Sequence, residues 1–511
     1  MKIPQLRKQT EKKTCHNYEW EDDYSWIHQE NCLEILRDKT KLNVEVKKYL
    51  EQENVYAEKN MEDTKILQKK LFTEIEGRIK LEDESLKFKD LKYEYWSKTT
   101  KEGNYSKQLR RKLGETEIET YWDGDIEAKG KKFFSAGDIE VSNNDELLAY
   151  SIDDKGSEYF TIFVRRISDK KIIEEPITET AGAITWAYDD LSFFYSKLDN
   201  LHRPRKIYQH KLGSSVKDDK LIYEENDERF TCGIGTSSDE KFYFISTSEH
   251  TSSEVYFIDK DDKNLTPILF NKRESGVQYS MNSWNNFFWM NTNKDAEDFK
   301  ILRCKHEAIN EWKDFIPSKK GTLIGSLTFL NDWIIRSEFS DALAKIYIRN
   351  IKSNLEEELK ITEEKVISPG ISLVQKDKNT DIIRIGYESP KTPSRFFEYN
   401  IKTKEKKLVK EQVVPSGHNR EDYIVERLNC TSHDGRQIPM TITYHKKTKL
   451  DGTAHVLLYG YGSYGMSMSP SFSSTRLSLI DRDIIWVTCH IRGGLERGMR
   501  WWKEGKMLNK K

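Results

Sequence analysis

The sequence predicts a β-propeller followed by the beginning of a parallel α/β sheet, mainly because strand-like runs repeat through its middle. Between residues 81 and 412, short aromatic or β-branched runs alternate with turns rich in Asp, Asn, Ser, Gly and Lys, as is typical of β-strands. They recur roughly every 45–55 residues, a period typical of four-stranded propeller blades. The most regular runs begin at Lys92, Leu147, Ser192, Phe242, Phe287, Trp333 and Ile382.

Seven such runs predict seven blades. A single sheet cannot bury both of its faces, and stacking sheets around a ring solves that problem. Weaker strand-like runs lie between the regular ones and begin at Phe160, Lys206, Glu254 and Lys345. The alternative is a large β-domain of another kind in which the spacing arose by chance, because the repeats are degenerate in sequence.

The segment before the repeats predicts helices. An apolar residue recurs at every fourth position through Leu67, Leu71, Ile75 and Ile79, which draws one stripe along a helix. Residues 20–80 are therefore expected to be helical.

The segment after the repeats predicts a different architecture. Asp434-Gly435 is a strong turn signal for a β-hairpin. Two apolar runs, 456–459 and 484–489, each lead into a glycine-rich loop. Short buried strands separated by crossovers are typical of a parallel α/β sheet.

The composition excludes several classes of protein. The net charge is −1, from 84 basic and 85 acidic residues, so nucleic-acid binding has no electrostatic support. Six scattered cysteines without a C-x-x-C pair argue against a zinc site or a disulfide framework and favour the reducing cytoplasm. The polar N-terminus is not a signal peptide, and no run reaches the ~20 apolar residues that span a membrane.

The densest chemical signal is the glycine- and tyrosine-rich stretch from Tyr459 to Gly465, together with His490-Ile491-Arg492-Gly493-Gly494 after the next apolar run. Glycines after a strand let the backbone turn sharply and approach a ligand. A turn of this kind is more often structural than functional when it stands alone. The functional interpretation therefore depends on the presence of both loops.

Those loops, with other segments spread along the chain, resemble the prolyl oligopeptidase family of serine peptidases, and within it the oligopeptidase B branch. The matching segments are DDYSW (22–26), YLEQENVYAE (49–58), ELLAYSID (146–153), YSKLDNLHRPRKIYQHKLG (195–213), LDGTAHVLLYGYGSYG (450–465), FSSTRLSLIDR (472–482) and HIRGG (490–494). The resemblance thus covers nearly the whole chain.

The resemblance implies a fold and an activity. It implies an all-β, seven-bladed propeller at 81–412 that caps an incomplete α/β-hydrolase domain, formed by helices at 1–80 and the first strands at 413–511. The implied activity is that of a cytoplasmic serine endopeptidase that hydrolyses short peptides after Arg or Lys by acyl-serine chemistry. No cofactor, metal, nucleic acid or membrane partner is implied.

The resemblance also implies roles for particular residues. Tyr461 matches the family tyrosine that donates a hydrogen bond to the oxyanion, and Tyr464 matches an aromatic residue near the substrate pocket. The acidic residues that favour basic peptides in relatives are absent from 466–471, which puts strong basic specificity in question. His490 precedes the triad region and is expected to be structural, as is Cys489.

The nucleophile is the feature that the sequence lacks. No G-x-S-x-G occurs in the 511 residues. In the family that the chain resembles, the catalytic serine, aspartate and histidine all follow the region of His490. The chain is therefore expected to be truncated before the catalytic triad and inactive without a separate C-terminal catalytic fragment, with the strand near 484–489 left as an exposed sheet edge. The alternative is a non-catalytic remnant or a propeller-based binding protein.

Overall fold

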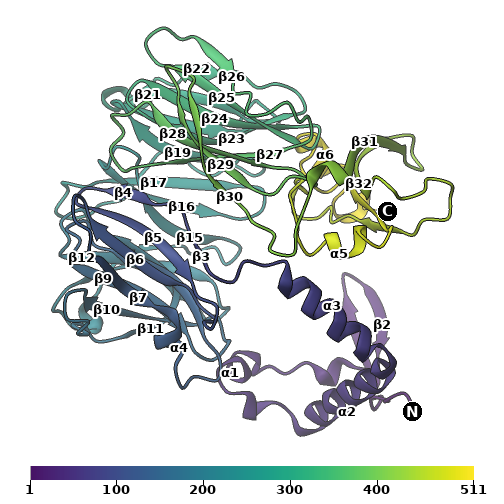
Figure 1. Cartoon of the computed structure of the whole chain (residues 1–511). Helices are drawn as coiled ribbons and strands as arrows, with labels where there is room; N and C mark the ends of the chain where they lie inside the picture. The colour runs from purple at the N-terminus through teal and green to yellow at the C-terminus, as the bar shows by residue number, and fades with distance from the viewer. Residues whose placement is uncertain (1, 511) are drawn as a thin grey trace.

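The computed structural model describes residues 2–510. Antiparallel sheets form the larger part of the molecule, while the N-terminal helices and the C-terminal segment lie together at one side of them (Figure 1). No helix in the described part of the chain is long and apolar enough to cross a membrane.

Four consecutive sheets of the middle region have four strands each, in sequence order. Their strands are β15 (Thr231–Thr236), β16 (Phe242–Ser248), β17 (Ser253–Asp259) and β18 (Ile268–Leu269); β19 (Tyr279–Trp284), β20 (Phe287–Thr292), β21 (Lys300–Lys305) and β22 (Lys313–Ile316); β23 (Thr322–Phe329), β24 (Trp333–Ser340), β25 (Leu343–Asn350) and β26 (Glu356–Glu358); β27 (Ser368–Leu373), β28 (Ile382–Glu388), β29 (Arg395–Asn400) and β30 (Lys406–Glu411).

The two sheets before these are less regular. In the first, β3 and β4 both pair with β5, which is followed by β6 and β7; the next has seven strands, β8 to β14. Their bounds are β3 (Asp83–Glu84), β4 (Phe88–Asp90), β5 (Tyr93–Thr99), β6 (Lys107–Lys112), β7 (Ile118–Asp123), β8 (Ser135–Val141), β9 (Leu147–Asp153), β10 (Phe160–Arg166), β11 (Ile177–Trp186), β12 (Ser192–Leu198), β13 (Pro204–Lys211) and β14 (Lys220–Glu224), with the short helix α4 (Gly124–Ala128) between β7 and β8.

The prediction of strands at the seven regular runs is confirmed, since they form β5, β9, β12, β16, β20, β24 and β28. Each of these strands buries apolar side chains against neighbouring sheets, and one core cluster joins β12 and β13 to β16. Their most buried apolar residues include Trp96, Leu148, Phe193, Ile245, Phe288, Ile335 and Ile383. Burial of both faces of each sheet accounts for the dense aromatic content of the runs.

The first and last sheets of the middle region meet and close it into a ring. Lys89 of β4 pairs in parallel with Gln375, just after β27. Lys410 on β30 forms an ion pair with Asp83 on β3 at 2.6 Å, and Arg384 donates to the Lys87 carbonyl at 2.9 Å. The closure is non-covalent and combines backbone pairing with charge.

The N-terminal segment is only partly as predicted. It begins with a hairpin, β1 (Glu11–Cys15) and β2 (Tyr18–Asp22), so the expected helical region starts later than residue 20. The helices are α1 (Cys32–Arg37), α2 (Val44–Asn60) and α3 (Lys65–Gly77). Asn43 caps α2 by accepting hydrogen bonds from the backbone of Glu45 and Val46.

The apolar stripe through α3 is only partly buried, with Leu71 and Ile75 half-buried. Leu67 is 53% exposed, and Ile79 lies beyond the helix end at Gly77 and is 47% exposed. The periodicity predicted the helix correctly but not its degree of burial, because periodicity reports which face is apolar and not what covers it.

The C-terminal segment forms a four-stranded sheet in the order β31-β32-β34-β33. Its strands are β31 (Tyr423–Thr431), β32 (Gln437–His445), β33 (Val456–Tyr459) and β34 (Ile485–Cys489), followed by the short helix α6 (Met499–Lys503). The hairpin predicted at Asp434-Gly435 joins β31 to β32 and is confirmed.

One expectation about this sheet is wrong. The strand near 484–489 is not an edge, because β34 lies between β32, which is antiparallel to it, and β33, which is parallel. The connection through α5 (Leu477–Ile480) carries the chain back across the sheet, so the later strand inserts beside β32 and β33 becomes the edge. Val456 and Leu458 on that edge are exposed.

Charged contacts join the N-terminal helices to the C-terminal segment. Arg78, just after α3, is buried and pairs with Asp481 at 2.8 Å and with the Ser478 hydroxyl at 3.2 Å. Glu74 on α3 pairs with Arg482 at 2.7 Å. Segments about 400 residues apart in sequence therefore form one contact, with α3 lying below α5 (Figure 1).

We expect this contact to weaken in acid. Arg482 holds the pKa of the Glu74 carboxyl at about 2, below its ordinary 4.5, so its stabilisation is present above pH 4.5 and lost as the pH falls toward 2. Because the two side chains are 27% and 35% exposed, screening reduces the contribution to ~1 kcal/mol. Glu74→Gln should lower the free energy of unfolding in urea by that amount near neutral pH and by almost nothing near pH 2.

The matched control is Glu58→Gln on the exposed surface of α2, which should have little effect at either pH. A Glu74→Gln effect of the same size at both pH values would contradict the assignment.

Candidate functional site

The two glycine-rich loops lie at the same edge of the C-terminal sheet. The strands β33 and β34 are parallel, with Val456 opposite Ile485 and Tyr459 opposite Thr488. The loops that follow them therefore leave the sheet side by side, as the carboxyl ends of parallel strands do in α/β folds. The Gly465 amide donates to the Gly493 carbonyl at 2.9 Å, which ties one loop to the other.

The close approach of the loops explains two of their glycines. Gly462 has φ +62°, and a Cβ there would lie 2.5 Å from Ile491 Cγ1 and 2.6 Å from the Arg492 carbonyl oxygen. Gly493 has φ +98°, and a Cβ there would clash with the Gly462 carbonyl. Both positions thus combine a left-handed backbone with a backbone contact that leaves no room for a side chain.

The two tyrosines of the first loop project differently. Tyr461 is 41% exposed, and Tyr464 is 73% exposed with φ +55°. The Tyr464 ring lies 5.8 Å, between centroids, from the ring of His250 in the β16–β17 turn. The structure therefore brings Tyr464 against the propeller, while the hydroxyl of Tyr461 has no hydrogen-bond partner within residues 2–510.

The second glycine-rich loop, residues 490–494, is supported by buried polar residues. His490 is fully buried, and its Nε2 lies 2.8 Å from the Thr441 hydroxyl on β32. Burial lowers its pKa to about 4, so the ring is neutral at pH 7. It is held inside the sheet, as expected for a structural residue. Cys489 is half-buried, and burial raises its pKa.

Arg492 and Glu496 each tie the second loop to another segment. Arg492 pairs with Asp434 of the β31–β32 turn at 2.6 Å. Glu496 is buried, and burial raises its pKa. One of its carboxylate oxygens accepts a hydrogen bond from the Met468 amide at 3.2 Å, and the other has no partner within residues 2–510. Glu496 thus joins the second loop to the stretch that follows Tyr464.

The propeller holds this region through two aspartates that the sequence reasoning missed. Asp298, in the β20–β21 turn, is buried and accepts hydrogen bonds from the amides of Met499 at 2.7 Å and Gly321 at 2.5 Å. Asp341, in the β24–β25 turn, pairs with Arg497 at 2.9 Å and Arg427 at 3.2 Å. No local sequence signal distinguishes either aspartate from the many turn aspartates of the repeats.

A serine–histidine contact elsewhere is not a candidate catalytic pair. The Ser283 hydroxyl lies 2.9 Å from His306 Nε2 and 2.8 Å from an Asp239 carboxylate oxygen. Ser283 is fully buried within the propeller, so no substrate reaches it. The described residues also contain no group of three or more His, Cys, Asp or Glu side chains placed to hold a metal ion.

Comparison with known sequences agrees with this architecture. Residues 4–412 match the N-terminal beta-propeller domain of prolyl oligopeptidase. The chain is 31% identical to dipeptidyl aminopeptidase BI of Pseudoxanthomonas mexicana, over 98% of this chain and 70% of that protein. It is 27% identical to protease 2 of Moraxella lacunata, over 100% of this chain and 73% of the relative.

Solved structures agree as well. Oligopeptidase B from Trypanosoma brucei with covalently bound antipain has a TM-score of 0.92 at 26% identity, over 100% of this chain and 74% of that one. Oligopeptidase B from Leishmania major shares the fold with the same TM-score and coverage at 24% identity. The chain belongs to the prolyl oligopeptidase family. Within that family it is an oligopeptidase B-like protein.

We expect Gly462→Ala to destabilise the protein by ~2 kcal/mol or more, because the new Cβ meets both a side chain and a backbone oxygen at a left-handed φ. Urea unfolding measures the change. Gly452→Ala is the matched control, since Gly452 has φ +88° but open space around its Cβ position. An equal loss of unfolding free energy in the two variants would contradict the role of the close contacts, since the strain of a positive φ would then account for the whole effect.

We also expect His490 to make stability depend on pH. The unfolded chain binds a proton below pH 6.5 whereas the folded chain does so only near pH 4. The stabilisation from the neutral ring is complete above pH 6.5, and up to ~3 kcal/mol of it is lost as the pH falls to 4. The free energy of unfolding of His490→Gln should change less over that range than that of the unsubstituted protein.

The exposed His433 in the β31–β32 turn supplies the control for this measurement. His433→Gln should retain the full pH dependence, and a His490→Gln profile parallel to that of the unsubstituted protein would refute the assignment.

Proposed function

We propose that this chain forms the propeller and the oxyanion side of an oligopeptidase B-like serine endopeptidase that hydrolyses short peptides after Arg or Lys. The observation that carries the proposal is the pair of glycine loops that presents Tyr461 at the carboxyl ends of β33 and β34. In this proposal the Tyr461 hydroxyl donates to the developing oxyanion. Tyr464, whose ring faces His250 of the propeller, contacts the side of the substrate.

The division of the chain that supports this function has three parts. In this proposal residues 81–412 form seven blades, with the seven-stranded sheet counted as two. The pairing of β11 with β10 at Ile177 and Thr180, and with β12 at Thr180 and Ile184–Trp186, supports that count. Residues 1–80 and 413–511 belong together to an incomplete α/β-hydrolase domain. The buried Arg78–Asp481 pair supports that grouping.

The names of the relatives support peptides as the substrate class. One relative is named a dipeptidyl aminopeptidase, another a protease, and one solved relative carries covalently bound antipain. Acyl transfer to serine requires a nucleophile, a base and an orienting carboxylate. Since the 511 residues contain no G-x-S-x-G, we propose that these groups come from additional polypeptide, such as a separate C-terminal catalytic fragment, and that residues 1–511 alone are inactive.

Two further points complete the proposal. All six cysteines are free thiols, which supports a cytoplasmic location. A non-catalytic role as a propeller-based binding protein is the second candidate, and the lack of a G-x-S-x-G among the 511 residues favours it. The absence of acidic residues from 466–471 bears only on the strength of basic specificity.

Hydrolysis of short peptides with Arg or Lys before the cleaved bond tests the proposal. Purified residues 1–511 should show no turnover, and activity should appear when a polypeptide carrying the G-x-S-x-G serine and the later Asp and His is supplied. In that complemented enzyme, Tyr461→Phe should lower kcat by ~10²–10³, because one oxyanion donor is lost.

Tyr459→Phe is the matched control, since Tyr459 packs on Trp486 at the end of β33. Turnover by residues 1–511 alone would contradict the proposed division of labour. Equal effects of the two substitutions would remove Tyr461 from the oxyanion site, and absence of activity after complementation would favour the binding protein.

A further inference from the structure

A cavity of about 400 Å³ lies on one face of the β27–β30 sheet, the last sheet of the ring. Residues that stand opposite each other on antiparallel strands project to the same face. Three opposed pairs of β27 and β28 line the cavity, namely Ser368 with Glu388, Gly370 with Gly386, and Ser372 with Arg384. The cavity thus has a carboxylate at one end, a guanidinium at the other and two glycines between them.

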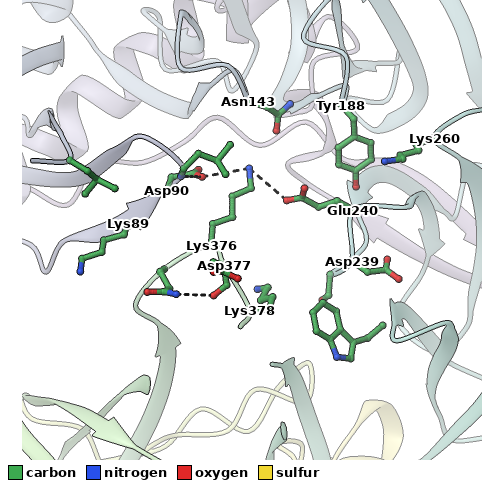
Figure 2. A pocket seen from close by; sticks show the side chains of 15 residues that line it. Lys89, Asp90, Asn143, Tyr188, Asp239, Glu240, Lys260, Lys376, Asp377 and Lys378 are labelled. Atoms are coloured by element: carbon green, nitrogen blue, oxygen red, sulfur yellow. Dashed lines mark hydrogen bonds and ion pairs between the residues drawn. The ribbon is translucent and has the colours of Figure 1, made fainter. Parts of the chain in front are cut away.

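This face of the sheet is turned toward the first sheet, where the ring closes. Arg384 donates to the Lys87 carbonyl at 2.9 Å. Lys376, just after β27, has its Nζ 3.7 Å from an Asp90 carboxylate oxygen on β4 and 3.6 Å from a Glu240 carboxylate oxygen (Figure 2). All the residues that line the 400 Å³ cavity belong to β27, β28, β29 and the turn before β29, so it is separate from the two glycine-rich loops.

Arg384 carries a buried positive charge that is only partly offset. The residue is 8% exposed, and within residues 2–510 its Nε has no hydrogen-bond partner and its guanidinium takes part in no ion pair. Burial lowers its pKa, although Glu398, opposite it on β29, acts to raise that pKa. The guanidinium stays protonated at neutral pH. Because a buried cation without a hydrogen-bonded anion is costly, the free Nε–H points to an anionic group on a ligand.

The two glycines leave open space beside that charge. Neither has a positive φ, so backbone geometry does not require them. A Cβ on Gly370 would meet no atom within 4 Å, whereas a Cβ on Gly386 would lie 2.9 Å from the Phe396 ring. The space above Gly370 is therefore open, with an aromatic ring beside it. Glycine inside a strand weakens the sheet and often marks a place where a ligand approaches the backbone closely.

Glu388 supplies the opposite charge at the other end of the cavity. It is half-buried, accepts a hydrogen bond from the Ser394 hydroxyl at 2.5 Å, and takes part in no ion pair within the described residues. Glu388 follows Arg384 by four positions on β28, so roughly 13 Å separates them at about 3.3 Å per residue. An extended peptide of about four residues spans that distance.

We propose that this cavity binds a short peptide with free termini, its C-terminal carboxylate on Arg384 and its N-terminal amine toward Glu388. A planar carboxylate matches the guanidinium, and hydrogen bonds between charged groups are the stronger kind. Ile371 and Phe396 provide apolar contacts for the middle of the peptide. The site does not depend on the chemistry proposed for Tyr461, so either proposal can fail without the other.

The first experiment titrates tetra-alanine, its C-terminal amide and its N-acetyl form into residues 1–511 by isothermal titration calorimetry. The amide should bind about tenfold more weakly than tetra-alanine, because Arg384 loses its charged partner. The N-acetyl form should bind about threefold more weakly, since the contact with the partly exposed Glu388 is weaker. Equal affinities of the three peptides, or no binding of tetra-alanine, would overturn the proposal.

Gly370→Val tests the cavity without changing any charge. The new side chain fills the open space above β27, so binding of tetra-alanine should be lost. Gly235→Val on β15 is the matched control, because Gly235 also has no positive φ and open space around its Cβ position. It should leave the affinity unchanged, and an equal loss in both variants would contradict the placement of the peptide.

Arg384→Met tests the charge. It should weaken binding of tetra-alanine about tenfold and abolish the difference between tetra-alanine and its amide. Arg349→Met is the matched control, because Arg349 also has a buried Nε without a hydrogen-bond partner in residues 2–510 but lies outside the cavity. Unchanged affinity in both Arg384→Met and Gly370→Val, with unaltered melting temperatures, would overturn the site. Should either variant fail to fold, the three peptides still decide the question on the unsubstituted protein.

Discussion

The closure of the sheet ring is the constraint on which the rest of this structure depends. Each sheet buries aromatic and branched side chains against its neighbours, so a row with two free ends would leave two apolar faces in water. The parallel pairing of Lys89 with Gln375 and the Lys410–Asp83 ion pair remove those ends. Once the ring is closed, its two ends become distinct surfaces with separate uses.

One end of the ring fixes the geometry of the C-terminal segment. Asp298 and Asp341 stand in turns of two different sheets and bind the Met499 amide and Arg497, both of which follow the second glycine loop. Glu496 carries that restraint to the Met468 amide and so toward Tyr464. The position of the tyrosine loop is thus set by propeller turns as well as by the β33–β34 pair.

The other end of the ring holds two kinds of contact between turns of different blades. Neighbouring turns are joined by hydrogen bonds that resist separation, whereas Lys376 and Glu240 are joined only by partly exposed charge. The two kinds of contact differ in how easily they break, because a paired backbone amide is protected from competition by water more than a solvated ion pair is.

The sequence by itself determined the repeating strands, the Asp434-Gly435 hairpin and the pairing of two glycine loops with two short strands. These features are local: a strand run, a turn dipeptide and a glycine after a strand each impose their geometry within a few residues. The resemblance to a peptidase family rested on the same local segments. The expectation that the strand at 484–489 forms a sheet edge came instead from the expected truncation, and it is wrong, because the strand lies inside the sheet.

Only the tertiary structure decided strand order, burial and the long-range charge pairs. The exposure of Leu67 on α3, the insertion of β34 and the joining of Arg78 to Asp481 depend on which segments meet in space. The contacts of Asp298 and of Lys376 are of the same kind, since a turn aspartate or a turn lysine looks alike at every repeat until the ring selects its neighbours. Sequence periodicity determines the geometry of a single helix or strand. The arrangement of those elements depends on packing between segments that are distant in sequence.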